Sequence, residues 1–254
     1  MVSLEHYLLT GIPIKTKELG TIHQPTINEL ISNGFSIEEF IHPFLIRLDM
    51  LELDNLNLGS FTEHIKDFDL LFLKADDDNF LFKDSKESSL YRLVNCLKLL
   101  YNTNNIKLSY GEQTIYIDNN IEINRNNFTK LADIVLEIFQ TSKPVKSNNK
   151  PKYKDKYRQQ LWEKLERKRA EEAKKNSLTI ADIINIVVHT NGYTSYKEVC
   201  NMTYYQLLNT YKTMLEIISY NEYLMFKSSG QFEMKQENKH WTSNAKIKKS
   251  TIIL

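Results

Sequence analysis

The segment 141–176 is almost without hydrophobic side chains, whereas the chain on both sides of it follows regular apolar patterns. A segment that has little apolar surface to bury stays outside a hydrophobic core. It therefore divides the chain into two folding units. We predict domains at 1–140 and 177–230, a charged linker at 141–176 and a polar tail at 231–254, which is compatible with a length of 254 residues.

Lys, Arg and Glu dominate the linker, and they predict a solvated single helix or coiled coil. Glu163 and Arg167 stand four residues apart in the order that stabilises a helix. An alternative is that the basic side chains neutralise nucleic-acid phosphates. The candidates for that role are Lys150, Lys152, Lys154 and Arg158. We favour the solvated helix, because the net charge of +1 leaves no basic excess over the whole chain.

The N-terminal unit is predicted to be an α+β domain. Its opening, 7–24, alternates Ile residues with Gly and Pro and reads as short extended pieces. Helices follow, and three of them begin with a capping signature, in which Ser or Asp and an acidic residue three positions later bond each other's backbone N–H. The pairs Ser36/Glu39, Ser60/Glu63 and Asp84/Glu87 show this signature, and a short helix after Pro25 stops at Asn33-Gly34.

Apolar alternation at 106–123 predicts a small β-meander, with turns at Gly111-Glu112 and Asp118-Asn119-Asn120. A further helix, capped by Asn126 or Asn127, follows it. The scarcity of Gly and Pro, with 7 and 5 residues, argues against an all-β fold. The predicted fold class is therefore mainly α with a small meander.

The C-terminal unit is predicted to be a small all-α domain. Three capping pairs open its helices with short connections between them. These pairs are Thr179/Asp182, Ser195/Glu198 and Thr203/Gln206. The tail beyond residue 230 is polar except for Trp241 and the final Ile252-Ile253-Leu254.

No catalytic or metal-binding pattern is present in the sequence. It has no Gly-rich phosphate loop, and its six His residues lack the spacing of metal ligands. The run Asp76–Asp78 lacks the Gly and distal Glu of a calcium loop. Cys96 and Cys200 lie in apolar helical patterns, where a thiol acts as a small hydrophobe and indicates a reducing compartment. We expect no enzyme activity, no cofactor and no membrane span.

Three phrases resemble those of phage proteins encoded in the tail region. They are "YLLTGIPIKTKELGTIHQPTI" at 7–27, "IDNNIEINRNNFTKL" at 117–131 and "NMTYYQLLNTYKTM" at 201–214, with His240-Trp241 near the end. The layout of globular domain, charged joint and small C-terminal extension is also similar to that of tail assembly chaperones of long-tailed bacteriophages. In that family, a frameshift at the joint commonly produces the longer form.

The resemblance implies a non-enzymatic role in the host cytoplasm. A tail assembly chaperone coats the long tape-measure protein, recruits tail-tube subunits to it and is absent from the mature particle. Such an assembly factor can also bind further copies of itself. The alternatives are a structural virion protein, such as a connector or baseplate component, and a nucleic-acid-binding accessory protein that uses the basic linker.

The candidate partner contacts lie on the last long predicted helix. They are Tyr204, Tyr205, Tyr211 and Met214, because Tyr and Met are favoured at adaptable interfaces. The same tyrosines also suit the edge of a core. For Leu207, Leu208 and Leu215, filling the core of the small domain is at least as good an explanation.

Overall fold

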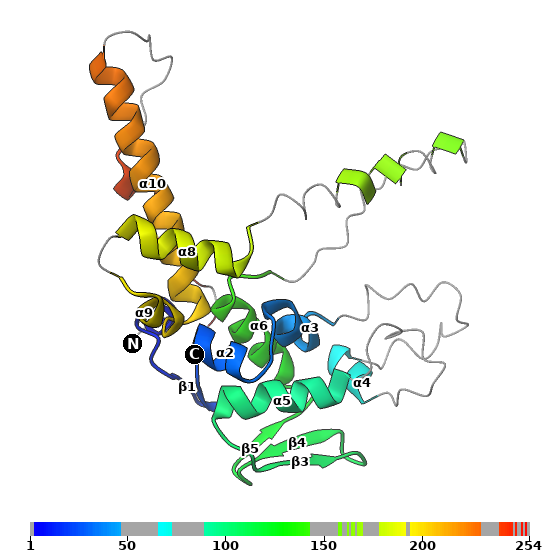
Figure 1. Ribbon diagram of the computed structural model, residues 1–254. Coiled ribbons are helices and arrows are strands. Elements are labelled where there is room, and N and C mark those ends of the chain that lie inside the picture. Colours follow the sequence, from blue (N-terminus) through cyan, green and yellow to red (C-terminus); the bar gives the residue numbers. More distant parts are fainter. Residues whose placement is uncertain are drawn as a thin grey trace.

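The computed structural model describes residues 3–46, 66–72, 89–142, 178–191, 194–229 and 239–245, a few positions within 157–169, and residues 247, 250 and 252. The described chain forms a rounded body from which one long helix projects (Figure 1). The elements are α1 Leu4–Thr10, β1 Ile14–Thr16, β2 Gly20–Ile22, α2 Ile27–Ser32, α3 Ile37–Leu45, α4 Asp67–Leu71, α5 Ser89–Tyr101, β3 Ile106–Ser109, β4 Thr114–Ile117, β5 Ile121–Ile123, α6 Phe128–Ile138, α8 Ile180–Asn191, α9 Tyr196–Cys200, α10 Tyr204–Ser229 and α11 Trp241–Asn244. The fold is mainly α with a small antiparallel part, as predicted.

A cluster of aromatic rings fills the centre of the N-terminal body. Helix α3 packs against both α5 and α6. Phe40 on α3 lies 5.1 Å from Phe139, and Phe44 stacks on Phe128 at 6.1 Å between ring centroids. Aromatic pairs at these separations add to the free energy gained from area burial alone. This core gives α6 and the residue that follows it a rigid position.

The predicted β-meander is confirmed. Strand β4 pairs antiparallel with β3 and β5, with Ile106 opposite Ile117 and Ile115 opposite Ile123. One face of the sheet is buried, which explains the apolar alternation in the sequence. The β4–β5 turn places Asp118 and Asn119 at φ values of 51° and 59°, which Asp and Asn adopt more readily than most residues. The sheet lies beneath α5 in Figure 1.

The capping box predicted within the described N-terminal residues is also confirmed, whereas Asn127 stands at the N-cap of α6 without a side-chain capping bond and accepts from Asn124 N–H instead. Ser36 and Glu39 form a complete capping box at α3. A second box at α2 pairs Thr26 with Glu29, one residue after the Pro25 that the sequence marked as the helix start. The pairs Ser60/Glu63 and Asp84/Glu87, and the run Asp76–Asp78, lie outside the described residues.

The opening of the chain differs from the prediction. Residues Leu4–Thr10 form helix α1, where extended structure was expected from Tyr7 onward. Leu4 and Leu8 are buried one helical turn apart, and Gly11 ends the helix in the left-handed region at φ 69°. A helix of two turns shows only one such apolar pair. The Ile alternation that follows it was the stronger pattern, and it predicted extended structure from Tyr7 onward. That alternation is real, because β1 and β2 form a hairpin with Ile14 opposite Ile22.

The three helices predicted for the C-terminal unit are present with their caps. Thr179 and Asp182 cap α8, Ser195 and Glu198 cap α9, and Thr203 and Gln206 cap α10. Helices α8 and α9 pack on the first half of α10. Their shared core consists of Ile27, Ile183, Ile184, Val187, Val199, Leu207 and Met214.

The N-terminal body and α10 meet directly. Thr26 and Thr203 form an isolated antiparallel bridge, and Ile27 N–H donates to the carbonyl of Met202 at 3.0 Å. Tyr205 belongs to the N-terminal core although it lies on α10. The division into domains remains a prediction, but the sequence analysis did not anticipate that the two units would be joined by more than the linker.

The linker and the tail are described in part. Of the linker, Tyr157, Arg158, Trp162, Lys164, Leu165 and Arg167–Arg169 are helical. The tail was predicted to be polar, yet α11 packs against α10 and Ile252 packs against the N-terminal core. Ser250 N–H also donates to the carboxylate of Glu5 on α1. The described part of the tail therefore returns to the body.

Candidate functional site

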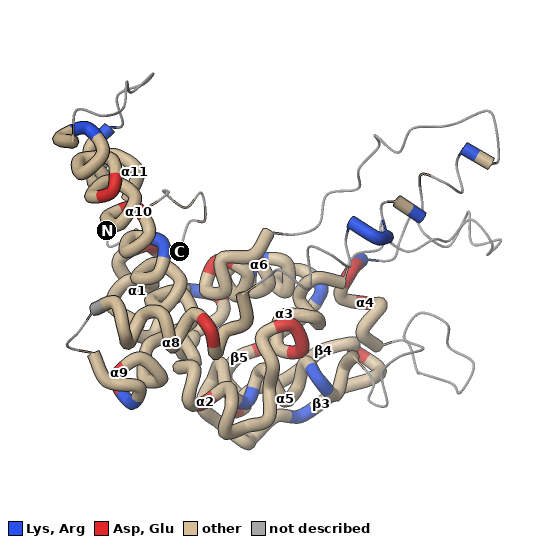
Figure 2. Tube along the Cα trace, turned by 45° about the horizontal axis from the view of Figure 1, so that its top comes forward, with Lys and Arg blue, Asp and Glu red and all other residues tan. Residues whose placement is uncertain are grey.

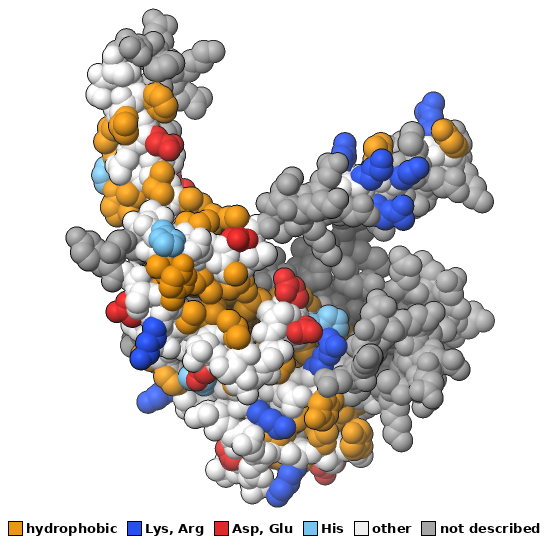
Figure 3. All heavy atoms as spheres, in the orientation of Figure 1, with side chains coloured by type: hydrophobic (Ala, Val, Ile, Leu, Met, Phe, Trp, Pro, Cys, Tyr) orange, Lys and Arg blue, Asp and Glu red, His pale blue; other side chains and the backbone are white. Residues whose placement is uncertain are grey.

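The projecting half of α10 carries exposed hydrophobic side chains in a regular line. Leu215, Ile218 and Met225 are 44%, 37% and 71% exposed. Together with Glu222, they follow each other at steps of three, four and three residues, which places them on one side of a helix. We call these four residues the open face of α10. Figure 3 shows hydrophobic side chains along this part of the molecule, and a second group around α8.

The open face continues a line that is buried in the first half of α10. Four residues before Leu215, Tyr211 is partly buried against the core that α8 and α9 share with α10. Leu207, four residues further back, is completely buried there. Helix α8 covers this line only where it crosses the first half of α10 (Figure 1). One apolar line therefore has two environments.

The opposite side of the projecting half is covered by α11. Asn244 donates to the carboxylate of Glu216 at 2.9 Å, and the His240 ring lies 4.8 Å from the Tyr220 ring. Tyr223 is buried on this side, and the Lys227 ammonium lies 5.8 Å from the centre of its ring. Helix α11 thus packs on one side of α10, and the open face on the other side stays exposed.

The four predicted partner contacts lie elsewhere on the helix. Tyr205 and Met214 are each 7% exposed, so they fill cores. Tyr204 packs on Phe139 at 5.5 Å and Tyr211 on the C-terminal core, so both are partly buried. Helix α8 and the N-terminal body cover the first half of α10 at these positions, and the role of the four residues in partner binding stays a prediction. Of the leucines for which core filling was at least as good an explanation, Leu207 is buried and Leu215 is exposed.

The predicted nucleic-acid contacts of the linker are largely outside the described residues. Lys150, Lys152 and Lys154 are not described, and Arg158 is an exposed helical residue. Lys and Arg mark several of the described linker positions (Figure 2). Leu165 is 47% exposed, which agrees with a solvated helix at this position. The nucleic-acid role of the linker stays a prediction.

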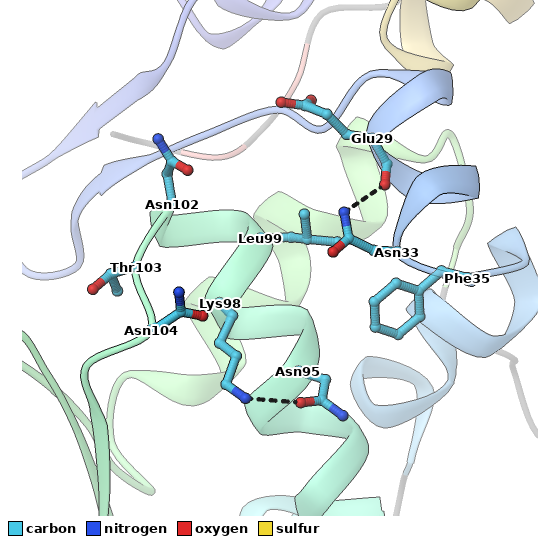
Figure 4. Close-up of a pocket in the computed structure, with 9 residues that line it drawn as sticks. All are labelled: Glu29, Asn33, Phe35, Asn95, Lys98, Leu99, Asn102, Thr103 and Asn104. Carbon is cyan, nitrogen blue, oxygen red and sulfur yellow. Dashed lines mark hydrogen bonds between the residues drawn. The ribbon is translucent and has the colours of Figure 1, made fainter.

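A polar pocket of about 800 Å³ lies between α2, α5 and the loop after α5. Its lining residues are Glu29, Asn33, Phe35, Asn95, Lys98, Leu99, Asn102, Thr103 and Asn104 (Figure 4). Two of the polar groups are engaged with neighbours. Asn33 donates to the Glu29 carbonyl at 2.8 Å, and Lys98 donates to the Asn95 amide oxygen at 3.2 Å. The pocket can offer hydrogen bonds to a polar molecule, but its described lining contains no nucleophile beside a base.

The titratable groups around this pocket have structural partners. Although burial opposes it, the Thr26 N–H and the His23 ring hold the pKa of Glu29 below its usual value. The Glu29 carboxylate accepts from Thr26 N–H at 2.7 Å and lies 3.1 Å from His23 Nε2, so it serves the α2 cap. Burial raises the pKa of the Cys96 thiol, which donates to the Phe40 carbonyl. A neutral, buried thiol of this kind is unreactive.

Across the described ranges, no group of three or more His, Cys, Asp or Glu side chains is placed to hold a metal ion. Among the helices of the same residues, none is long and hydrophobic enough to cross a membrane.

Comparison with known families supplies a further observation. Residues 172–246 match the family model described as the YomV second domain. This family is phage-associated, from Bacillus prophage, so the match indicates a phage protein. The matched region contains α8, α9, α10 and α11, and hence the whole open face. Neither a curated protein nor a solved structure matches the chain.

The candidate surface lies on the same helix as the predicted partner contacts, but further along it. The exposed residues Ile218 and Met225 were visible in the sequence as a continuation of the apolar line beyond Leu215. A helix of 26 residues spans about 39 Å, far more than the 12-residue α8 can cover. That difference in length was the signal that the second half of the line lacks cover from the neighbouring helices.

Proposed function

We propose that this protein is a non-enzymatic phage tail assembly chaperone that binds the tape-measure protein and brings tail-tube subunits to it. The exposed apolar line on the projecting half of α10 is the observation that carries this proposal. Exposed apolar surface that is regular and rimmed by polar residues is typical of protein-binding sites. The phage-associated match over 172–246 supports it, since that region contains the line.

The physical task of such a chaperone suits this surface. A long coiled-coil protein exposes an apolar stripe until it is packed, and during that time it is prone to aggregate. An apolar helix face is a suitable temporary cover, because helices recognise one another through residues spaced at i, i+3 and i+4. The polar pocket beside α2 offers no comparable surface. The proposed place of action is the host cytoplasm, and we expect the protein to be absent from finished particles.

The test is co-expression with the tape-measure protein encoded by the same phage genome. We expect this protein to keep the tape-measure protein soluble and to co-purify with it, whereas expression of the tape-measure protein alone gives insoluble material. Mass spectrometry of purified particles is the second measurement. Stoichiometric presence in the particle would replace the proposal with a structural virion protein, and salt-dependent DNA retention without tape-measure capture would replace it with a nucleic-acid-binding protein.

A further inference from the structure

The open face is the second half of an apolar line on α10. The first half of that line already packs against helix α8. Tyr211 precedes Leu215 by four residues, and the side chains before it pack against α8. The spacing of the line matches the ridge that one helix presents to another. From Tyr211 to Ser229 the helix rises about 27 Å, which is enough for roughly five turns of a partner helix. The complementary shape is therefore a helix rather than a strand or a small molecule.

Glu222 interrupts the apolar line between Ile218 and Met225. It lies four residues after Ile218 and three before Met225, and its side chain is exposed. Among the described residues, no cation forms an ion pair with it, and Lys227 lies over Tyr223 on the side that α11 covers. A carboxylate that enters an apolar contact needs an opposite charge or a hydrogen-bond donor. A helix bound here must therefore carry a basic residue at the matching step.

The position of Glu222 also disfavours a second copy of this chain as the occupant. A parallel pair of α10 helices places the two Glu222 side chains directly opposite each other. An antiparallel pair centred on the open face places them within about 6 Å along the axis. Like charges at such positions destabilise helix pairing. The surface is thus suited to a partner of different sequence.

We propose that the open face of α10 binds one amphipathic helix of another protein, whose apolar seam carries a Lys or Arg opposite Glu222. This inference rests on the proposed function, because the tape-measure protein is the helical partner proposed there. It adds the residues that make the contact and the charge that selects the bound segment. It also predicts that segments with an acidic residue in the same place are rejected.

The probes are two designed helical peptides of about three heptads. Both have a Leu seam, and the central seam position is Lys in one and Glu in the other. We expect the full-length protein to bind the Lys peptide at least about tenfold more tightly than the Glu peptide. Glu222→Lys should reverse this order. Equal binding of the two peptides, or an unchanged order in Glu222→Lys, would overturn the proposal.

The apolar part is tested with Leu215→Ser combined with Ile218→Ser. This variant should lose at least about tenfold in affinity for the Lys peptide. Ile31→Ser on α2 is the matched control, because Ile31 is an exposed aliphatic residue outside the open face. It should bind normally. Circular dichroism should be unchanged for all variants, since the altered residues are exposed, and equal binding by the double variant and the control would contradict the assignment.

Failures of the two proposals are distinguishable. Tape-measure capture that persists in the Leu215→Ser/Ile218→Ser variant would overturn this inference and leave the chaperone function standing. Selective binding of the Lys peptide without tape-measure capture would overturn the function and leave the surface assignment standing. A concentration-dependent dimer that Ile218→Ser abolishes would assign the open face to a second copy and overturn the inference.

Discussion

The two halves of α10 share one apolar line and differ in what surrounds it. In the first half, Leu207 and Met214 are buried against α8 and α9, and Tyr205 enters the N-terminal core. In the second half, Leu215, Ile218 and Met225 are exposed. Equivalent spacing thus serves stability in one half and remains available for binding in the other. The difference is set by the neighbouring helices, because α8 crosses α10 only along its first half.

The largest predicted difference between the two halves of α10 is in the stability that is lost when one Leu of each half is replaced by Ala. Leu207→Ala should lower the free energy of unfolding by about 2–5 kcal/mol, because it removes buried methyl groups and leaves a cavity. Leu215→Ala should change it by less than about 0.5 kcal/mol. Urea unfolding of both variants measures this contrast. Similar losses would mean that the second half of the line is also covered in solution.

A smaller loss of stability is expected at the contact between the N-terminal body and the first half of α10. Gly11 has φ 69°, and a Cβ there would lie 3.1 Å from the Gln206 amide, which itself donates to the Leu9 carbonyl at 2.8 Å. Gly11→Ala should cost about 1–2 kcal/mol from its left-handed backbone, with some addition from this contact. Gly34→Ala is the matched control, because Gly34 has φ 75° and open space around it. Thermal unfolding should show the greater loss for Gly11→Ala.

The smallest effect concerns the acid sensitivity of the same junction. The folded state lowers the pKa of Glu29, so this carboxylate contributes stability above its unfolded value and loses it as pH falls through the lowered folded value. Glu29 belongs to the capping box of Thr26, whose backbone pairs with Thr203 at the start of α10. Wild type should therefore lose stability more steeply than Glu29→Gln as pH falls below about 4.5, the usual pKa of Glu. If the stability of the two proteins fell equally with pH, Glu29 would not be the source of this acid sensitivity.

Much of the fold could be predicted because its signals are local. The caps at Ser36, Ser195 and Thr203 each depend on a partner three residues away, and all are present. The meander was readable because Ile115, Ile117 and Ile123 alternate along strands with one buried face. Helix α1 was missed because Leu4 and Leu8 give only a single apolar repeat. The predicted partner contacts lie on the covered half of α10 and the open face on the other half, since spacing alone does not tell which part of a line is covered.

The sequence by itself determined most of the helices and strands, where most of them begin, and that α10 carries an apolar line. Those properties follow from hydrogen bonds and side-chain periods within a few residues. Only the tertiary structure decided that Tyr205 is buried in the N-terminal core and that the Tyr220 ring contacts His240 beside α11. It also decided that Ile218 and Met225 remain exposed. Burial depends on which distant elements meet a side chain, and α10 meets elements from both ends of the chain.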